Sequence, residues 1–173
     1  GVDPQVWERV AVLTLDLVRQ FPDVTHVNLG GGFKIARMAT DKATDIQQCG
    51  GRVKDCFEAF AAETGRKLHL EIEPGTFLVA NAGSLLARVE DVVDTGAEGH
   101  TFVKLNCGMG EIMRPVLYGA QHPISIINEE KELVKSVIVG HCCESGDALS
   151  MGANGIEARE VKKCQRGDFV VVA

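Results

Sequence analysis

Residues 141–147, HCCESGD, concentrate thiol and carboxylate side chains in one short stretch. Cys142 and Cys143 stand directly before Glu144, and Asp147 closes the segment. A thiol and a carboxyl group placed together can act as acid and base in a proton transfer. A lone cysteine is nevertheless more often an inert, buried thiol than a reactive one. The segment therefore predicts either a proton-transfer site or a structural thiol in a charged loop, and its residues alone leave both open.

Two glycine-bearing turns follow stretches with the pattern of strands. Residues 30–32 are three glycines after THVNL, and Glu73 with a Pro-Gly pair ends KLHLEIE. Glycine lets a backbone turn sharply and approach a ligand closely, and successive N–H groups can form a nest for a phosphate. The glycine run lacks the G-x-G-x-x-G spacing of dinucleotide sites. A phosphate site is one interpretation, and plain turns with a solvated carboxylate are the other.

Arg114 and Tyr118 lie four residues apart, with the rigid Pro115 between them. An arginine can hold a carboxylate through two parallel hydrogen bonds, and a tyrosine hydroxyl can add a third. The pair predicts a carboxylate-binding site, and a surface arginine beside a packed tyrosine explains it equally well.

Two helices are predicted in the first part of the chain. Asp3 can cap a helix that ends near Phe21, because Ser, Thr, Asp and Asn are preferred before the first turn. Its apolar residues recur at spacings of four and three, which predicts a buried stripe of Val6, Val10, Leu13 and Leu17. A second helix is expected over residues 45–64, with Gly65 as its stop.

The order helix, strand, helix, strand over residues 1–76 indicates parallel βα units. Strand-like runs separated by turns follow, and they predict an antiparallel β domain over residues 77–173. The sequence thus predicts an α/β part followed by an all-β part.

The composition excludes several classes of protein. The formal net charge is -6 and the pI about 5.4, which argues against binding to a nucleic-acid backbone. No apolar run approaches the ~20 residues that cross a bilayer. The 6 cysteines form no C-x-x-C pair, so we expect reduced thiols, no metal site and a cytoplasmic location.

Four motifs together resemble one family. NLGGGF, LEIEPGTFLVANAG, MRPVLYGAQHPI and CCESGD occur here in the order and rough spacing of the diaminopimelate decarboxylases, which are fold-type III, alanine-racemase-like enzymes that use pyridoxal 5'-phosphate (PLP). The resemblance implies the C-terminal part of a PLP-binding TIM-type (β/α)8 barrel, followed by part of an antiparallel β domain. It also implies a homodimer with its active site at the interface, acting on a small amino-acid substrate.

The resemblance also assigns roles to individual residues. Backbone amides of two turns would bind the PLP phosphate, namely those of Gly30, Gly31, Gly32, Gly75 and Thr76. Glu73 would hydrogen-bond the pyridine nitrogen and keep it protonated, which makes the ring an electron sink when CO₂ leaves.

The substrate and catalytic residues come from the second half of the chain. Arg114 and Tyr118 would hold the far end of the substrate. Cys143 would reach over from the partner subunit to reprotonate the carbanion, and Glu144 would contact a substrate ammonium group.

Two departures from the family pattern bear on function. The family usually has an arginine after EPG that binds the distal carboxylate of the substrate, and Thr76 stands there. Decarboxylation of meso-diaminopimelate to L-lysine is the first expectation, because Arg114, Tyr118 and the CESGD loop fit it, and Thr76 makes a decarboxylase of D-ornithine, D-lysine or another basic amino acid the rival.

The Schiff-base lysine of the family lies on an early barrel strand, and none of Lys34, Lys54, Lys67 and Lys104 has its sequence context. We accordingly expect a fragment that lacks the N-terminal part and the C-terminal end, and that has no decarboxylase activity by itself. A catalytically inactive regulatory homologue is the alternative from another functional class.

Overall fold

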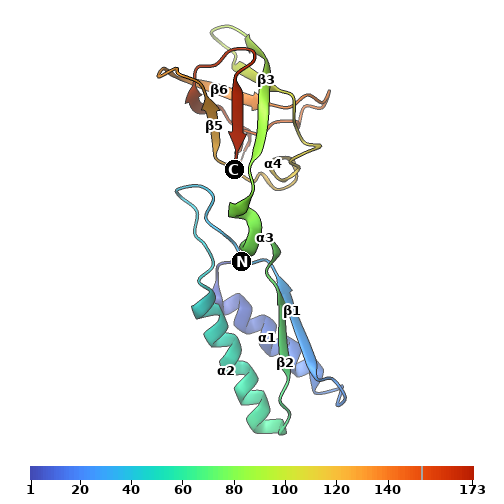
Figure 1. The fold of residues 1–173 in the computed structure, drawn as a ribbon. Coiled ribbons are helices and arrows are strands. Elements are labelled where there is room, and N and C mark those ends of the chain that lie inside the picture. The colour runs from blue at the N-terminus through green and yellow to red at the C-terminus, as the bar shows by residue number, and fades with distance from the viewer. Residues whose placement is uncertain (153) are drawn as a thin grey trace. The chain divides into compact units, whose positions relative to one another are not determined.

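The computed structural model describes residues 1–152 and 154–173, which form two compact units, Gly1–Ala82 and Gly83–Ala173 (Figure 1). The sequence placed a domain boundary between residues 76 and 77, whereas the compact units divide after Ala82. The difference arises because a helix runs through the expected boundary.

The first unit alternates helices and strands, as the sequence predicted. Its elements are α1 (Pro4–Val18), β1 (His26–Gly31), α2 (Ile46–Thr64), β2 (His69–Glu73), α3 (Gly75–Val79) and a 3₁₀ turn, η1 (Ala80–Ala82). The β1 and β2 strands pair in parallel, which confirms the predicted βα arrangement.

Local signals set the helix ends. The side chain of Asp3 accepts the N–H of Gln5, which caps α1. Asp45 caps α2 in the same way, and Gly65 ends α2 in the left-handed region at φ 72°. Capping satisfies N–H groups that have no partner inside the helix, so these residues fix the boundaries without help from the rest of the fold.

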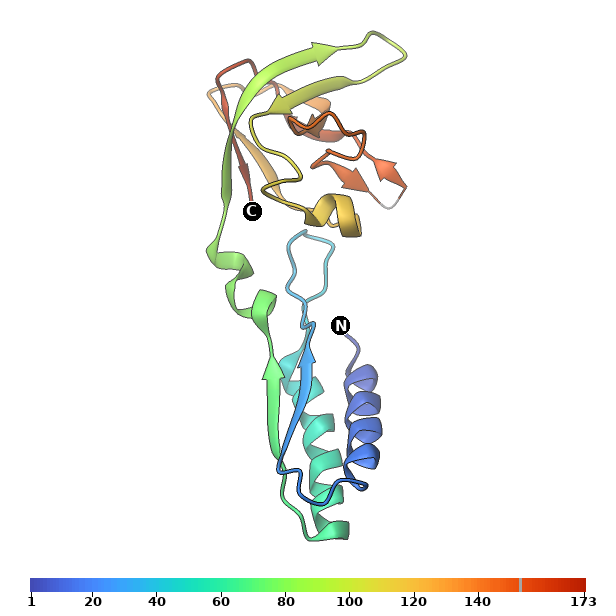
Figure 2. The same ribbon diagram turned by 90° about the vertical axis from the view of Figure 1, so that its right-hand side faces the viewer.

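The α1 and α2 helices lie side by side along the β1–β2 pair (Figures 1 and 2). The buried face of α1 consists of Trp7, Ala11, Leu15 and Val18. The predicted stripe of α1 was wrong, because its members are 36% to 68% exposed, namely Val6, Val10, Leu13 and Leu17. Both faces satisfy helical spacing. The face with Trp7 is the buried one because its indole stacks on Phe33 at a ring distance of 4.1 Å.

The second unit consists mainly of strands. In chain order it contains β3 (Leu85–Asp94), β4 (Thr101–Leu105), α4 (Arg114–Tyr118), β5 (Ile124–Ile127), β6 (Leu133–Val139), β7 (Met151–Gly152), β8 (Gly155–Ile156), β9 (Arg159–Lys162) and β10 (Phe169–Val172). Six of these strands form one sheet in the order β5-β10-β3-β4-β6-β9. The β3 and β4 strands form a long twisted hairpin (Figure 2).

Two predictions for this part were wrong. The run that starts at residue 77 was expected to be a strand, but it continues α3 and η1 before β3 begins. The sheet was expected to be antiparallel, but β4 and β6 pair in parallel, so the sheet is mixed. The parallel pair arises because the long connection from β4 to β6 contains α4 and β5, and β5 pairs with β10 at the other side of the sheet.

The core of the second unit lies inside this sheet. Val89, Val137, Ile138 and Val170 have no exposed surface. The edge strands β5 and β9 come into contact, so the sheet curls into a nearly closed barrel-like shape. Among the described residues, no helix combines the length and apolar character that crossing a bilayer requires.

Candidate functional site

The carboxyl ends of β1 and β2 bring the glycine turn and Glu73 together. Gly31 is the register partner of Glu73 in the parallel pair. A side chain at Gly31 would overlap the backbone oxygen of Glu73, so only glycine permits this approach. Two predicted site residues that are 42 positions apart in the sequence, from 31 to 73, are therefore neighbours at one edge.

Asn28, which no pattern in the sequence marked, connects the glycine turn to Glu73. Its Nδ2 donates to Oε1 of Glu73 at 3.0 Å, and its Oδ1 accepts the N–H of Gly30 at 2.7 Å. One amide side chain thus orients the carboxylate and shapes the turn. The signal in the sequence was weak, because an asparagine two residues before a glycine is common in ordinary turns.

The two turns leave space next to their backbones. Gly30 and Gly32 have φ values of 72° and 94°, a region that favours glycine. A side chain at Gly30 or at Gly75 would meet no atom within 4 Å. Thr76 follows Gly75 on α3 and is exposed. An exposed carboxylate beside open glycine backbone fits a ligand that carries an anion on one side and a protonated ring nitrogen on the other.

An aromatic stack fixes the chain directly after the glycine turn. Phe33 lies between Trp7, with ring planes 9° apart, and Phe77, whose ring meets it edge-on at 6.0 Å. Phe77 belongs to α3, so this stack ties the glycine turn to the helix that starts at Gly75. The aromatic stack thereby fixes the position of the glycine turn relative to the turn at Gly75.

The second unit carries the other predicted residues. Arg114 begins α4, and its guanidinium carbon lies 5.8 Å from the ring centre of Tyr118. Tyr118 is 73% exposed. The Nε of Arg114 is buried, and it finds no hydrogen-bond partner among the described residues. An exposed phenol beside a guanidinium whose Nε donor is unused suits a carboxylate ligand.

The loop of residues 140–147 lies beside α4. A side chain at Gly146 would come within 3.5 Å of Cγ1 of Val116, in the middle of α4. Cys143 and Glu144 are both exposed in this loop. The Glu144 carboxylate accepts the hydroxyl of Ser145 at 3.2 Å and a backbone N–H. The structure therefore brings the loop next to the helix that carries Arg114 and Tyr118.

Asp147 is the buried member of this loop, with 3% of its surface exposed. Its carboxylate accepts the N–H of Met109 at 2.6 Å and the N–H of Cys142 at 2.8 Å. The sequence alone assigns this carboxylate no individual role. Partial loss of contact with water, followed by the neighbouring Asp147, raises the pKa of the exposed Cys142 thiol above its ordinary value. Burial also raises the pKa of Cys107 to about 11.

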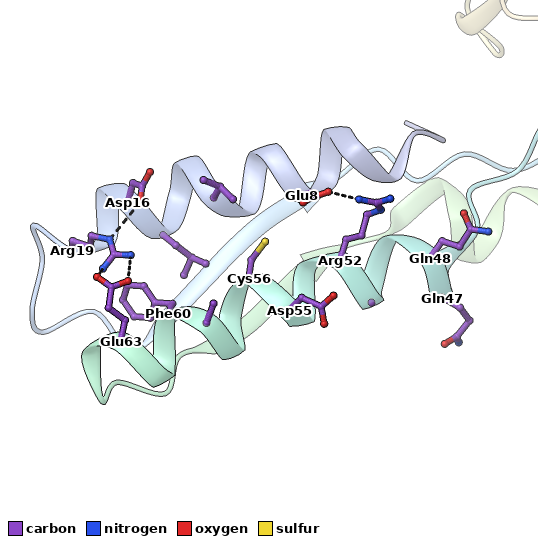
Figure 3. A pocket seen from close by; sticks show the side chains of 14 residues that line it. Glu8, Asp16, Arg19, Gln47, Gln48, Arg52, Asp55, Cys56, Phe60 and Glu63 are labelled. Atoms are coloured by element: carbon purple, nitrogen blue, oxygen red, sulfur yellow. Dashed lines mark hydrogen bonds and ion pairs between the residues drawn. The ribbon is translucent and has the colours of Figure 1, made fainter.

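A separate groove of about 780 Å³ lies between α1 and α2 (Figure 3). Several of its charges are paired with one another. Arg52 bonds Glu8, and both terminal nitrogens of Arg19 bond the carboxylate of Glu63 at 2.7 and 2.8 Å. Because ion pairs join α1 to α2 across it and its lining does not include the turns at the ends of β1 and β2, we interpret the groove as a seam between two helices.

Comparisons with known proteins agree on one family. Residues 13–173 match the family described as "Pyridoxal-dependent decarboxylase, C-terminal sheet domain". The diaminopimelate decarboxylase of Escherichia coli is 32% identical over 180 residues, which cover 99% of this chain and 42% of that protein. The diaminopimelate decarboxylase of Aquifex aeolicus is 31% identical and is covered to 36%. The chain thus spans less than half the length of the relatives it matches.

Solved structures give the same result. A crystal structure of diaminopimelate decarboxylase matches with a TM-score of 0.88 at 32% identity, covering 99% of this chain and 42% of that one. A diaminopimelate decarboxylase from m. jannaschii, in complex with L-lysine, matches with a TM-score of 0.81 at 25% identity, covering 99% and 38%. The fold of both units is therefore found in solved structures.

Proposed function

The chain belongs to the pyridoxal-dependent decarboxylases, and on that premise we propose that the protein of which it forms part converts meso-diaminopimelate to L-lysine and CO₂ with PLP as cofactor. One observation carries the proposal. The register partnership of Gly31 and Glu73 places an acid beside a glycine turn at the ends of two parallel strands, which is where barrel enzymes collect their active sites.

The residues of the first unit supply the cofactor site of this proposal. Backbone amides at the two turns bind the phosphate, namely those of Gly30, Gly31, Gly32, Gly75 and Thr76. Glu73 accepts a hydrogen bond from the protonated pyridine nitrogen, and Asn28 holds the carboxylate in place. When bound, PLP supplies the electron sink that lets a carboxylate leave its α-carbon as CO₂.

The residues of the second unit supply the substrate site. Arg114 and Tyr118 bind the distal carboxylate, which the unpartnered Nε of Arg114 supports. The Cys143 thiol donates its proton to the carbon that has lost CO₂, and Glu144 holds a substrate ammonium group. In this proposal Cys143 and Glu144 complete the site of the partner subunit, so the active form is an isologous homodimer.

The same proposal extends to the architecture and location of the whole protein. The β1–β2 pair and its helices form part of a (β/α)8 barrel, and residues 1–76 and 77–173 belong to the barrel and β domains respectively. The mixed sheet of the second unit is part of the β domain. The cytoplasm stays our predicted location.

Thr76 favours a second candidate substrate. It stands, exposed on α3, where the family usually has an arginine that binds the distal carboxylate. Loss of a charged partner weakens binding of such a group by about 1.5–3 kcal/mol. A D-configured basic amino acid without a second carboxylate, such as D-ornithine or D-lysine, avoids that loss.

The test is CO₂ release by the purified full-length protein with PLP, compared among meso-diaminopimelate, D-ornithine and D-lysine. We expect the highest kcat/KM with meso-diaminopimelate. A preference for either basic amino acid transfers the proposal to the second candidate. Binding of PLP without CO₂ release from any of the three supports an inactive regulatory homologue instead. The 173-residue chain alone serves as the control and is expected to be inactive.

A further inference from the structure

Asp147 is a buried carboxylate to which the proposed chemistry gives no task. No ion pair to it occurs among residues 1–152 and 154–173. Removing an ionised carboxylate from water is unfavourable unless hydrogen bonds replace the lost solvent. Two backbone N–H groups from two different segments do so here, those of Met109 and Cys142.

The space around this carboxylate is shaped by two glycines. A side chain at Gly108 would lie 2.5 Å from both carboxylate oxygens of Asp147, and a side chain at Gly140 would overlap the same two atoms. Neither glycine has a positive φ, so backbone conformation does not require glycine at these positions. Glycine is required at both positions because any side chain there would occupy the space of the Asp147 carboxylate.

The backbone of Asp147 closes the same loop. Its N–H donates to the carbonyl of Glu144 at 3.0 Å, and its carbonyl accepts the N–H of Gly140 at 2.8 Å. With the side-chain bond to Cys142, three hydrogen bonds from one residue enclose the turn that presents Cys143. Within the part of the chain that the structure describes, the Cys143 side chain makes no hydrogen bond that would hold it.

We infer that Asp147 is the positioning residue that holds the loop of residues 140–147 against the segment of residues 107–109, so that Cys143 is presented in a fixed orientation. The inference rests on the proposed function, because it assigns Asp147 to the thiol that donates the proton. The two oxygens of an ionised carboxylate accept from both segments at once. An asparagine offers only one such oxygen, and its NH₂ group would face an N–H donor.

The experiment is a double-mutant cycle in the full-length protein. Asp147→Asn should lower kcat for CO₂ release by about 30-fold, within the ~10²-fold or larger contribution of a well-placed acid, and should leave KM within about 2-fold. In a Cys143→Ala background the same substitution should change kcat by less than about 2-fold, because the group that it positions is gone. A purely structural role predicts the same loss in both backgrounds, and that result would overturn the inference.

Matched variants separate this effect from general damage. Gly108→Ala should reproduce the loss, because the new methyl group displaces the carboxylate, whereas Gly110→Ala meets no atom within 4 Å and should leave kcat unchanged. Asp168→Asn is the control for the charge change. Asp168 also accepts a backbone N–H and a side-chain amide, at 3.0 and 2.8 Å, in a turn outside the loop.

A second measurement does not depend on activity. Hydrogen exchange with mass spectrometry should show faster exchange in Asp147→Asn in peptides that cover residues 107–109 and 140–143, with the sheet strands unchanged. Unchanged exchange in both peptides contradicts the inference whatever the kinetics show. Absence of CO₂ release from the unsubstituted protein contradicts the proposed function instead, so the two failures are distinguishable.

Discussion

The two units differ in how completely they cover their own strands. In the second unit Val89, Val137 and Ile138 are inaccessible to solvent, and the sheet nearly closes on itself. In the first unit every residue of β2 is exposed, including Leu70 and Ile72 at 40%. Parallel strands in proteins are normally covered on both faces. The difference indicates that the strands of the second unit bury much of their apolar surface against one another, whereas β2 needs further packing partners, as the proposed barrel provides.

The comparison is tested most strongly by truncating one leucine in each unit. Leu105→Ala in the second unit should lower the free energy of unfolding by about 2–5 kcal/mol, because Leu105 is 1% exposed and its loss leaves a cavity. Leu13→Ala on the exposed face of α1 should change it by about 0.5 kcal/mol or less. Urea unfolding of the 173-residue chain measures both. Equal effects would contradict the burial of Leu105 and the exposure of Leu13.

The next largest effect is expected at the ends of the parallel strands. Glu73→Gln in the full-length protein should lower kcat for CO₂ release about 100-fold, because the charge that stabilises the protonated ring nitrogen is lost. Glu71→Gln, on the same exposed strand, is the matched control and should retain kcat. A similar loss in both variants would show that β2 tolerates no charge change and would remove the special role of Glu73.

The close approach of the two strands can be tested with a single methyl group. Gly31→Ala should destabilise the chain by about 1–3 kcal/mol, because the new atom overlaps the backbone oxygen of Glu73. Gly50→Ala in α2 meets no atom within 4 Å and should stabilise the helix by about 0.5–1 kcal/mol. Thermal unfolding of both variants checks the sign. A neutral Gly31→Ala would show that the strands separate easily.

The buried thiol of the second unit predicts a pH effect. Burial raises the pKa of Cys107 from 9.0 to about 11 in the folded chain. The folded pKa lies above the unfolded value, so the folded chain holds the thiol proton more tightly than the unfolded chain does. The free energy of unfolding therefore keeps its full value below pH 9.0 and falls as the pH rises toward 11. By pH 10 the loss is about 1 kcal/mol relative to pH 8. Urea unfolding at both pH values should show a steeper decline in the native chain than in Cys107→Ala, and equal slopes would place Cys107 in water.

The smallest effect is expected in the groove between the helices. Glu63→Gln removes an ion pair whose side chains are 37% and 63% exposed, so it should destabilise the chain by less than about 1 kcal/mol. The difference should shrink in high salt, because screening weakens exposed charge pairs. Loss of CO₂ release in this variant would show that the groove does more than join α1 to α2.

Sequence reasoning succeeded where the signal is local. Asp3, Asp45 and Gly65 mark helix ends because capping depends on a few adjacent residues. It failed for the buried face of α1, because two faces satisfy the same spacing and only the stack of Trp7 on Phe33 decides between them. It also missed the parallel β4–β6 pair, which depends on a long connection rather than on the strands themselves.

The candidate site divides in the same way. The glycine turn and Glu73 were predicted as separate features, and the parallel register makes them neighbours. The hydrogen bonds of Asn28 and Asp147 could not be predicted, because each joins segments that only the fold brings together. The residue types in the sequence were enough to suggest a cofactor site at Glu73 and the glycine turn. The residues that orient this site and the loop, Asn28 and Asp147, could be identified only from the contacts in the structure.

The exposure of β2 has a consequence for handling the isolated chain. A two-stranded sheet leaves an outer row of backbone donors and acceptors unpaired, and β2 adds apolar side chains to that row. Such edges recruit strands from other molecules and lead to aggregation. We therefore expect isolated copies of the 173-residue chain to aggregate through β2, the strand that carries Glu73, at high concentration. The remaining strands of the proposed barrel would pair with β2, so the same elements that complete the active site would also prevent this aggregation.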